Sequence, residues 1–405
     1  MNLLIQENAI INNKYSNQYL LLTVVLYFIN PLFGIGALII NIVQYKQEQI
    51  KYYYTLIFMI SCYLGLIAMT KVKITDLGQY IDEYNLCKNK TFFEYLSLFN
   101  KEYIFYTFNY ILYQVFAGMS NMYVFSIISL GYYLLLISVL HYFKNQYNED
   151  SMVALYSIIF ISFFELYFAW VAHLVRQILS STFFIYFIIQ YYVKHKRLWW
   201  AVIISIFIHS ASMLFFVIFI VIELTKINKN LSLNLIRSIL LSLLLIISFG
   251  YLYNLLHNIY PFDYIFSRIE EERIVDSSNI YATDWIIPNV ILYTMLIISL
   301  YILFRKKTEH YEKSLLIMYL FYFVFMIYEL KSDNYLLAYR MMIYIYMFMP
   351  FILFMPLRYS GNKFIYPLYI SIVLIVFFRF FRSLSLSGYY ASLEQILFFP
   401  PLLYF

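Results

Sequence analysis

Residues 121–142 read NMYVFSIISLGYYLLLISVLHY, a run that contains no Asp, Glu, Lys or Arg. A run of about 17–25 mainly apolar residues is long enough to cross a bilayer as a helix. Similar runs lie at 18–43, 53–70, 152–170, 174–193, 236–256, 288–304, 314–330, 338–357 and 364–381. The sequence therefore predicts an all-α, polytopic transmembrane helical bundle of about 10–12 membrane segments. We expect one integral membrane domain over residues 1–405.

The composition excludes a soluble globular protein. Of the 405 residues, 63% are hydrophobic and only 12% are charged, whereas a soluble domain has about 25% charged residues. The 46 Tyr residues are expected in belts at the two membrane interfaces, or in a groove where their rings stack on sugars. The net charge of +6 is assigned to cytoplasmic loops, so no nucleic-acid partner is predicted.

Two apolar stretches are ambiguous, namely 103–117, which is short, and 199–224, which polar residues interrupt. If the first does not cross and the second is a re-entrant hairpin, the basic residues of the short loops share one side of the membrane, as cytoplasmic loops require. These residues are Lys46, Lys51, Lys144, Lys194, Lys196, Arg197, Lys226, Lys229, Arg237, Arg305, Lys306, Lys307, Lys313, Arg358 and Lys363. This arrangement predicts about ten crossings, with both chain ends outside.

Two long segments of mixed charge then face outward. The first is the loop 71–120, in which 92–100 and 103–117 are expected to be helices lying at the interface. The second is the loop 257–287. We therefore expect any chemistry on the outer face.

The chain has no Gly-rich phosphate loop or other nucleotide-binding motif, which argues against a primary pump or an enzyme that uses nucleotide sugars. Its two cysteines, Cys62 and Cys87, have no metal-ligand spacing and are not expected to form a disulfide. No metal and no cofactor are predicted.

An ionisable side chain at membrane depth costs about 2.5–3.5 kcal/mol on insertion scales, so each one is a candidate functional group. Arg176 opens a predicted span next to Gln177, with His173 one turn earlier on the same helical face. The guanidinium suits phosphate, so these residues are predicted to bind an anion such as a lipid-linked diphosphate. Alternatively, Arg176 extends to lipid headgroups, or it simply pairs with Glu165.

Three further positions are candidates. His209 lies at the break in 199–224, where it is either an acid/base group or a partner for exposed backbone groups. Arg340 opens another predicted span and either joins Arg176 on one polyanion or extends to headgroups. Asp76, with Tyr80 four residues later, is a candidate base for an acceptor hydroxyl, or simply a solvated loop acid.

Three ordered motifs resemble the EpsG-like branch of the Wzy-type bacterial polysaccharide polymerases. They are Asp-x-x-x-Tyr (Asp76, Tyr80) followed by an acidic residue before an apolar helix (Glu102, Phe105), Arg-Gln opening a span (Arg176, Gln177), and His followed by small residues (His209, Ser210, Ala211). Their order and spacing agree over roughly residues 70–215. The chain departs from the family pattern at His173, where we expect Asn, and at Ser180 and Ser181, where Ala is usual.

The resemblance implies a metal-independent glycosyltransferase of the bacterial cytoplasmic membrane, with its active site on the outer face. Its substrate would be an oligosaccharide repeat linked to undecaprenyl diphosphate in the membrane lipids, and its product an exopolysaccharide, capsule or O-antigen chain. A flippase and a chain-length regulator are the implied partners. Catalysis would fall to Asp76, His209 and Arg176, and substrate binding to Arg176, Gln177, Arg340, Tyr80, His173 and Glu165.

Two other classes stay open. One is a membrane-bound acyl or sugar transferase that modifies surface glycans; an acyltransferase would carry Arg and His near its N-terminus, and residues 1–70 contain neither. A flippase or transporter of lipid-linked oligosaccharide would show paired broken helices in two related halves. Only one broken hairpin, at 199–224, is evident in the sequence.

Overall fold

The structure is a computed structural model. It describes residues 18–44, 50–73, 75–99, 102–144, 151–209, 211–225, 286–304, 309–331, 335–359, 365–388 and 390–398. Every regular element in these ranges is a helix, which confirms the predicted all-α class. The predicted span 236–256 lies outside the described residues, as does the predicted outer loop 257–287 except for its last two residues, where α15 begins.

The first half of the chain forms the helices α2 (Pro31–Gln44), α3 (Ile50–Met69), α4 (Thr75–Asn85), α5 (Phe92–Leu96), α6 (Tyr103–Val115), α7 (Ser120–Phe143), α8 (Ser151–Ser162), α9 (Glu165–Val171), α10 (Val175–Val193), α11 (Trp199–Ile208) and α12 (Ser212–Thr225). A helix over Gln18–Ile29 precedes them. The second half forms α15 (Ile286–Leu303), α16 (His310–Lys331), α17 (Tyr335–Tyr346), α18 (Met349–Tyr359), α19 (Ile365–Ser387) and α20 (Leu393–Phe398).

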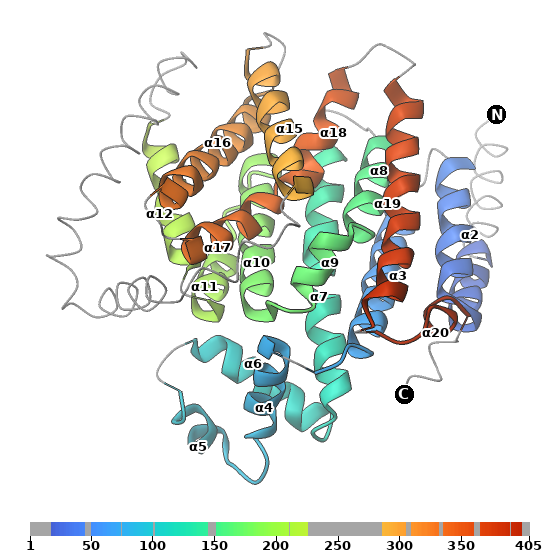
Figure 1. The fold of residues 1–405 in the computed structure, drawn as a ribbon, viewed down its shortest axis with the longest axis vertical. Coiled ribbons are helices and arrows are strands. Elements are labelled where there is room, and N and C mark those ends of the chain that lie inside the picture. The colour runs from blue at the N-terminus through green and yellow to red at the C-terminus, as the bar shows by residue number, and fades with distance from the viewer. Residues whose placement is uncertain are drawn as a thin grey trace, which may run out of the picture.

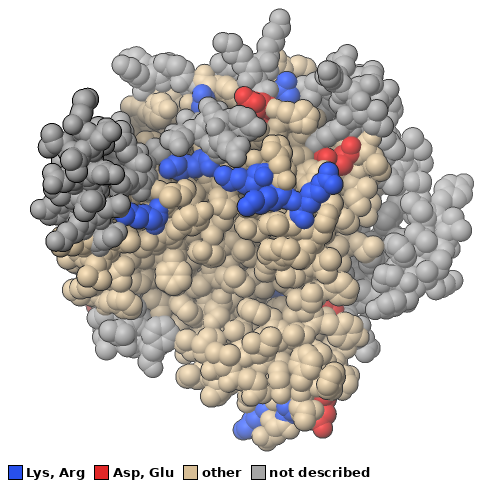
Figure 2. All heavy atoms as spheres, turned by 180° about the vertical axis from the view of Figure 1, so that it is seen from behind, with Lys and Arg blue, Asp and Glu red and all other residues tan. Residues whose placement is uncertain are grey.

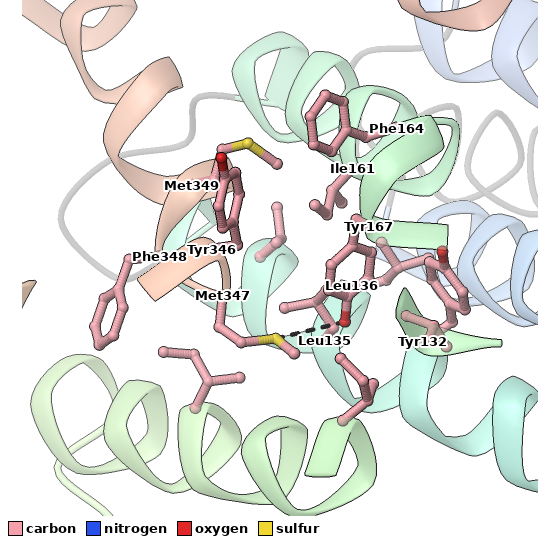
Figure 3. Close-up of a cluster of buried hydrophobic side chains, with 14 of the residues drawn as sticks. Tyr132, Leu135, Leu136, Ile161, Phe164, Tyr167, Tyr346, Met347, Phe348 and Met349 are labelled. Atoms are coloured by element: carbon pink, nitrogen blue, oxygen red, sulfur yellow. Dashed lines mark hydrogen bonds between the residues drawn. The ribbon is translucent and has the colours of Figure 1, made fainter. Parts of the chain in front are cut away.

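Helix α7 is central in the bundle and packs against α3 and α10 (Figure 1). Its inward face joins side chains from α9 and from the α17–α18 junction in a cluster of aromatic, Leu and Met residues (Figure 3). There the buried Tyr167 hydroxyl donates to Met347 Sδ at 3.4 Å. In a membrane, moving an apolar side chain from lipid into the protein gives no hydrophobic free energy. Helices therefore associate through close packing and hydrogen bonds of this kind.

The described part of the chain confirms a polytopic membrane bundle. Five segments are long and apolar enough to cross a bilayer, namely Ile50–Met69, Ser120–Phe143, His310–Tyr328, Met341–Tyr359 and Ile365–Ser387. Shorter apolar helices accompany them, at Gln18–Ile29, Pro31–Gln44, Trp199–Ile208, Ser212–Leu224 and Asn289–Leu303.

Three predicted continuous spans are interrupted, and in one of them, 338–357, the interruption is only the turn at Met347 and Phe348 between α17 and α18. The run 18–43 divides at Asn30, because proline fits the first turn of a helix and disfavours helical backbone in the residue before it. The Asn30 Oδ1 atom accepts the Leu32 amide at 2.9 Å and so caps α2. The run 152–170 bends by 59° between α8 and α9, where the Ser162 hydroxyl donates back to the Ile158 carbonyl at 2.7 Å, a contact that often bends helices.

The predicted hairpin at 199–224 consists of α11 and α12, with 10 and 14 residues. At 1.5 Å per residue these helices are about 15 and 21 Å long, shorter than the roughly 30 Å hydrocarbon layer. The chain reverses at His209, the residue that ends α11. The break predicted from the polar cluster in this apolar run is therefore confirmed.

Helices α4, α5 and α6 pack together at one end of the bundle (Figure 1), and we call them the cap. The segments 92–100 and 103–117 are helical there, as α5 and α6, although α5 is shorter than the predicted 92–100, and their place at a membrane interface stays a prediction. Thr91 and Glu94 form reciprocal bonds that fix the start of α5. Figure 2 shows Lys and Arg side chains gathered in a band toward the opposite end of the molecule from the cap.

Candidate active site

Glu102 begins α6 with its backbone in the left-handed region, at φ 56° and ψ 37°. This conformation costs a residue other than glycine of order 1–3 kcal/mol. Glu102 is the N-cap residue, yet its side chain makes no capping bond. The side chain is instead only 5% exposed, against groups from two other helices.

The first of these groups is the Arg176 guanidinium, from the first turn of α10. Its Nη1 atom donates to Glu102 Oε2 at 2.6 Å and to the Tyr106 hydroxyl at 3.1 Å. The guanidinium carbon lies 4.8 Å from the ring centre of Tyr80 and 5.6 Å from that of Phe105, so cation–π attraction adds to the ion pair. With 15% of its side chain exposed, Arg176 faces the cap rather than lipid headgroups.

The second group is the imidazole of His209, at the reversal between α11 and α12. Its Nδ1 atom lies 2.9 Å from Glu102 Oε1, and its side chain is 14% exposed. One carboxylate thus bonds to Arg176 with one oxygen and to His209 with the other. We call Glu102, Arg176 and His209 the ionic triad.

Serine hydroxyls hold the hairpin in this position. Ser180 on α10 and Ser205 on α11 each donate a hydroxyl proton to the other's carbonyl, both at 2.8 Å. The Ser212 hydroxyl bonds to that of Ser180, and to the Tyr344 hydroxyl at 2.9 Å. Hydrogen bonds between helices inside a membrane fix their relative positions, so His209 is held level with the start of α10.

A second carboxylate lies behind the triad. The Tyr106 hydroxyl, which accepts from Arg176, donates to Glu83 Oε2 at 3.4 Å. Gln79 donates to Glu83 Oε1 at 3.1 Å. Burial raises the pKa of the Glu83 carboxyl above its ordinary value, and the charge of Arg176 opposes that shift.

Asp76 and His173 meet outside the triad. His173 Nε2 lies 3.9 Å from Asp76 Oδ2. The prediction that His173 shares a helical face with Arg176 is wrong, because α10 begins only at Val175 and His173 lies in the preceding turn. Burial lowers the pKa of the His173 imidazole, and the charge of Asp76 partly offsets this. This shift and the 3.9 Å separation make the contact weaker than a close ion pair.

The other predicted residues are distributed as follows. Glu165 pairs with Arg379 Nε at 2.8 Å rather than with Arg176. Gln177 is buried in the first turn of α10, and Tyr80 is buried against Arg176. Arg340 is part of α17, but its side chain lies outside the described residues, so its convergence with Arg176 stays a prediction.

Sequence reasoning missed the roles of Glu102, Tyr106 and Glu83. Glu102 was noted only as part of a spacing pattern, although an acidic residue directly before an apolar amphipathic helix is itself a signal. Within the described ranges, no three or more His, Cys, Asp or Glu side chains are grouped so that they could hold a metal ion.

Comparison with known proteins gives one result. A sequence model described as the EpsG family matches residues 51–396, a range that includes the ionic triad and the cap. Neither curated proteins nor solved structures gave a match.

Proposed function

This chain belongs to the EpsG family of proteins related to Wzy-like exopolysaccharide polymerases, and on that premise we propose that it joins lipid-linked oligosaccharide repeat units into a polysaccharide. Membership supports a multi-pass membrane protein of polysaccharide biosynthesis. The proposal adds the reaction, the undecaprenyl diphosphate carrier, and a site on the outer face of the cytoplasmic membrane.

The observation that carries the proposal is the ionic triad. An arginine and a histidine from separate helices meet on one buried carboxylate, at the surface between the bundle and the cap. Positioned cationic groups stabilise the negative charge that develops on a leaving diphosphate. A histidine oriented by a carboxylate is suited to accept a proton from a hydroxyl group.

The proposed step is a single displacement at the anomeric carbon of the donor chain. A hydroxyl oxygen of the acceptor repeat forms a bond to that carbon, while the bond from the carbon to the diphosphate oxygen breaks. The lipid diphosphate leaves with the bonding electron pair next to Arg176. The hydroxyl proton passes to His209, which Glu102 orients through the 2.9 Å contact.

The remaining candidate residues are assigned to sugar and carrier binding. Asp76 lies one helical turn before Tyr80 on the same face of α4 and contacts His173, which supports a role in accepting hydrogen bonds from sugar hydroxyls. Tyr80 and Phe105 fix the guanidinium plane. Gln177, Glu165, His173 and Arg340 stay proposed substrate contacts.

The chain length of the cell-surface polysaccharide tests the proposal. We expect Arg176→Gln and His209→Asn to abolish long chains while single repeats are still made. The rate should fall by roughly 10²–10³-fold when one positioned group is lost.

Matched controls are available at the other end of α10. Arg197→Gln and His195→Asn make the same chemical changes at two exposed positions in the turn between α10 and α11. They should leave chain length unchanged. Long chains made by triad variants that are inserted in normal amounts would remove the triad from the mechanism.

A further inference from the structure

One stripe of side chains on α19 changes character halfway along the helix. Leu368, Ile372, Ile375 and Val376 line an apolar groove, and the stripe continues to Arg379. Beyond Arg379, the residues Phe380, Ser383, Leu384 and Ser387 line a second and more polar cavity. Spacings of three and four residues place them all on one helical face, along roughly 28 Å of helix.

The groove lies between α19 and helices α8, α15 and α18, and has a volume of about 360 Å³. Its walls include Phe160, Ile298, Leu353 and Phe354. Its charged residues are Glu165 and Arg379, which form an ion pair with each other. The groove is thus suited to a hydrocarbon chain along most of its length.

The second cavity has a volume of about 400 Å³. Lys71, His173, Trp170 and Tyr390 contribute to its wall, which therefore combines basic groups with aromatic rings. Glu165 and Leu166 line both this cavity and the groove, so the two spaces adjoin at the bend between α8 and α9.

Arg379 marks the boundary between the apolar and polar parts. Its contact with Glu165 uses Nε, and 54% of its side chain is exposed. The guanidinium therefore has further donors available to an anion. Among the candidate spans of the described chain, α19 is the least enclosed, with 22% of its apolar window buried, so a ligand could enter the groove sideways from the lipid.

We propose that the groove and the cavity together bind one lipid-linked phosphate substrate, the acceptor repeat, with its single apolar chain along α19 and its phosphate, which does not leave in the reaction, at Arg379. This inference rests on the proposed function, because it assigns a carrier-lipid site to that reaction. The sugar-bearing head then occupies the cavity beside His173, which contacts Asp76 and lies three residues before Arg176. The head is thereby directed from the groove toward the ionic triad.

Binding of radiolabelled undecaprenyl diphosphate to the full-length protein in lipid nanodiscs tests the proposal. Ile375→Trp puts a larger side chain into the groove. Ile375 is already 64% exposed, so the fold should tolerate the substitution. We expect affinity to fall about tenfold, the equivalent of roughly two methylene groups left unburied. The neighbouring Leu374 is 50% exposed and does not line the groove, so Leu374→Trp should leave affinity within about twofold.

A second pair repeats the comparison on α15, where Ile298 lines the groove and the exposed Ile297 does not. Ile298→Trp should weaken binding and Ile297→Trp should not. Arg379→Gln should weaken binding of undecaprenyl diphosphate about tenfold while leaving binding of undecaprenol, which has no phosphate, unchanged.

Three results would overturn the proposal: equal effects of the two substitutions in each pair, no effect of Arg379→Gln, or displacement of the label by phosphatidylglycerol as readily as by unlabelled undecaprenyl diphosphate. Because binding is measured without turnover, the two proposals fail separately. If the protein joins repeats but its Ile375→Trp variant binds undecaprenyl diphosphate normally, only the groove proposal is refuted. The expected binding pattern in a protein that joins no repeats would refute only the polymerase.

Discussion

Glu102→Gln is the substitution that tests the ionic triad most severely. Glutamine keeps the size of the side chain and one acceptor oxygen, but it removes the negative charge and presents an amide donor to Arg176 or His209. These two side chains are only 15% and 14% exposed. Removing one partner of a buried ion pair costs about 3–5 kcal/mol. We expect the lower end, about 3 kcal/mol, because Glu83 lies close to Arg176 through Tyr106.

A double-mutant cycle separates the ion pair from general damage. Arg176→Gln alone leaves Glu102 with His209 as its remaining partner in the triad, whereas Glu102→Gln combined with Arg176→Gln removes both charges. The double variant should therefore be more stable than the sum of the single effects predicts, by at least about 1.5 kcal/mol. Unfolding of the purified protein in nanodiscs, followed by heat or denaturant, measures this coupling.

The backbone of Glu102 provides an independent arm of the same experiment. Glu102→Gly and Glu102→Ala both delete the carboxylate, but only glycine adopts a φ of 56° without steric cost. The glycine variant should be more stable than the alanine variant by about 1 kcal/mol, and both should be inactive. Additive single effects, or an alanine variant as stable as the glycine variant, would refute this account of the site.

Three further outcomes are expected. Ser212→Ala should cost about 1 kcal/mol and lower polymer yield by more than its effect on protein amount, because the reversal that holds His209 loses bonds to α10 and α17. Glu312→Gln should destabilise the protein by about 3 kcal/mol, since this carboxylate is fully buried against Arg358; folded protein recovered from membranes measures this. A membrane-impermeant maleimide should label Phe93→Cys in intact cells and Lys196→Cys only after permeabilisation. Both positions are exposed; Phe93 belongs to the cap, and Lys196 follows the end of α10 that lies away from the cap. The reverse pattern would invert the proposed topology.

The helical bundle was predictable because a segment that crosses the hydrocarbon layer must be long, apolar and helical. Long apolar runs are visible in the sequence. The breaks were predictable only where a local signal exists. Pro31 ends a helix by its own covalent structure, and this signal was available but not used. The bend after Ser162 accompanies a serine hydroxyl bond to its own helix, but the same bond at Ser61 and Ser138 leaves α3 and α7 unbroken, so the apolar run does not reveal where the helix ends.

The candidate site was predictable in part for a similar reason. Arg176 and His209 stand out because charged or titratable groups are costly at membrane depth. Glu102 does not stand out, because it lies in a loop where an acidic residue is unexceptional. Its role depends on a left-handed backbone conformation and on contacts with residues 74 and 107 positions away. Glu165 was predicted near an arginine, yet its partner Arg379 is 214 residues away in sequence.

Reconstitution with a defined substrate tests the central claim most directly. Purified protein in proteoliposomes would receive a synthetic repeat linked to undecaprenyl diphosphate, and both chain length and released lipid diphosphate would be measured. The account predicts one lipid diphosphate released for each new linkage, and neither product from Arg176→Gln. Movement of intact substrate across the bilayer with no release, or equal linkage by wild-type and Arg176→Gln protein, would contradict it.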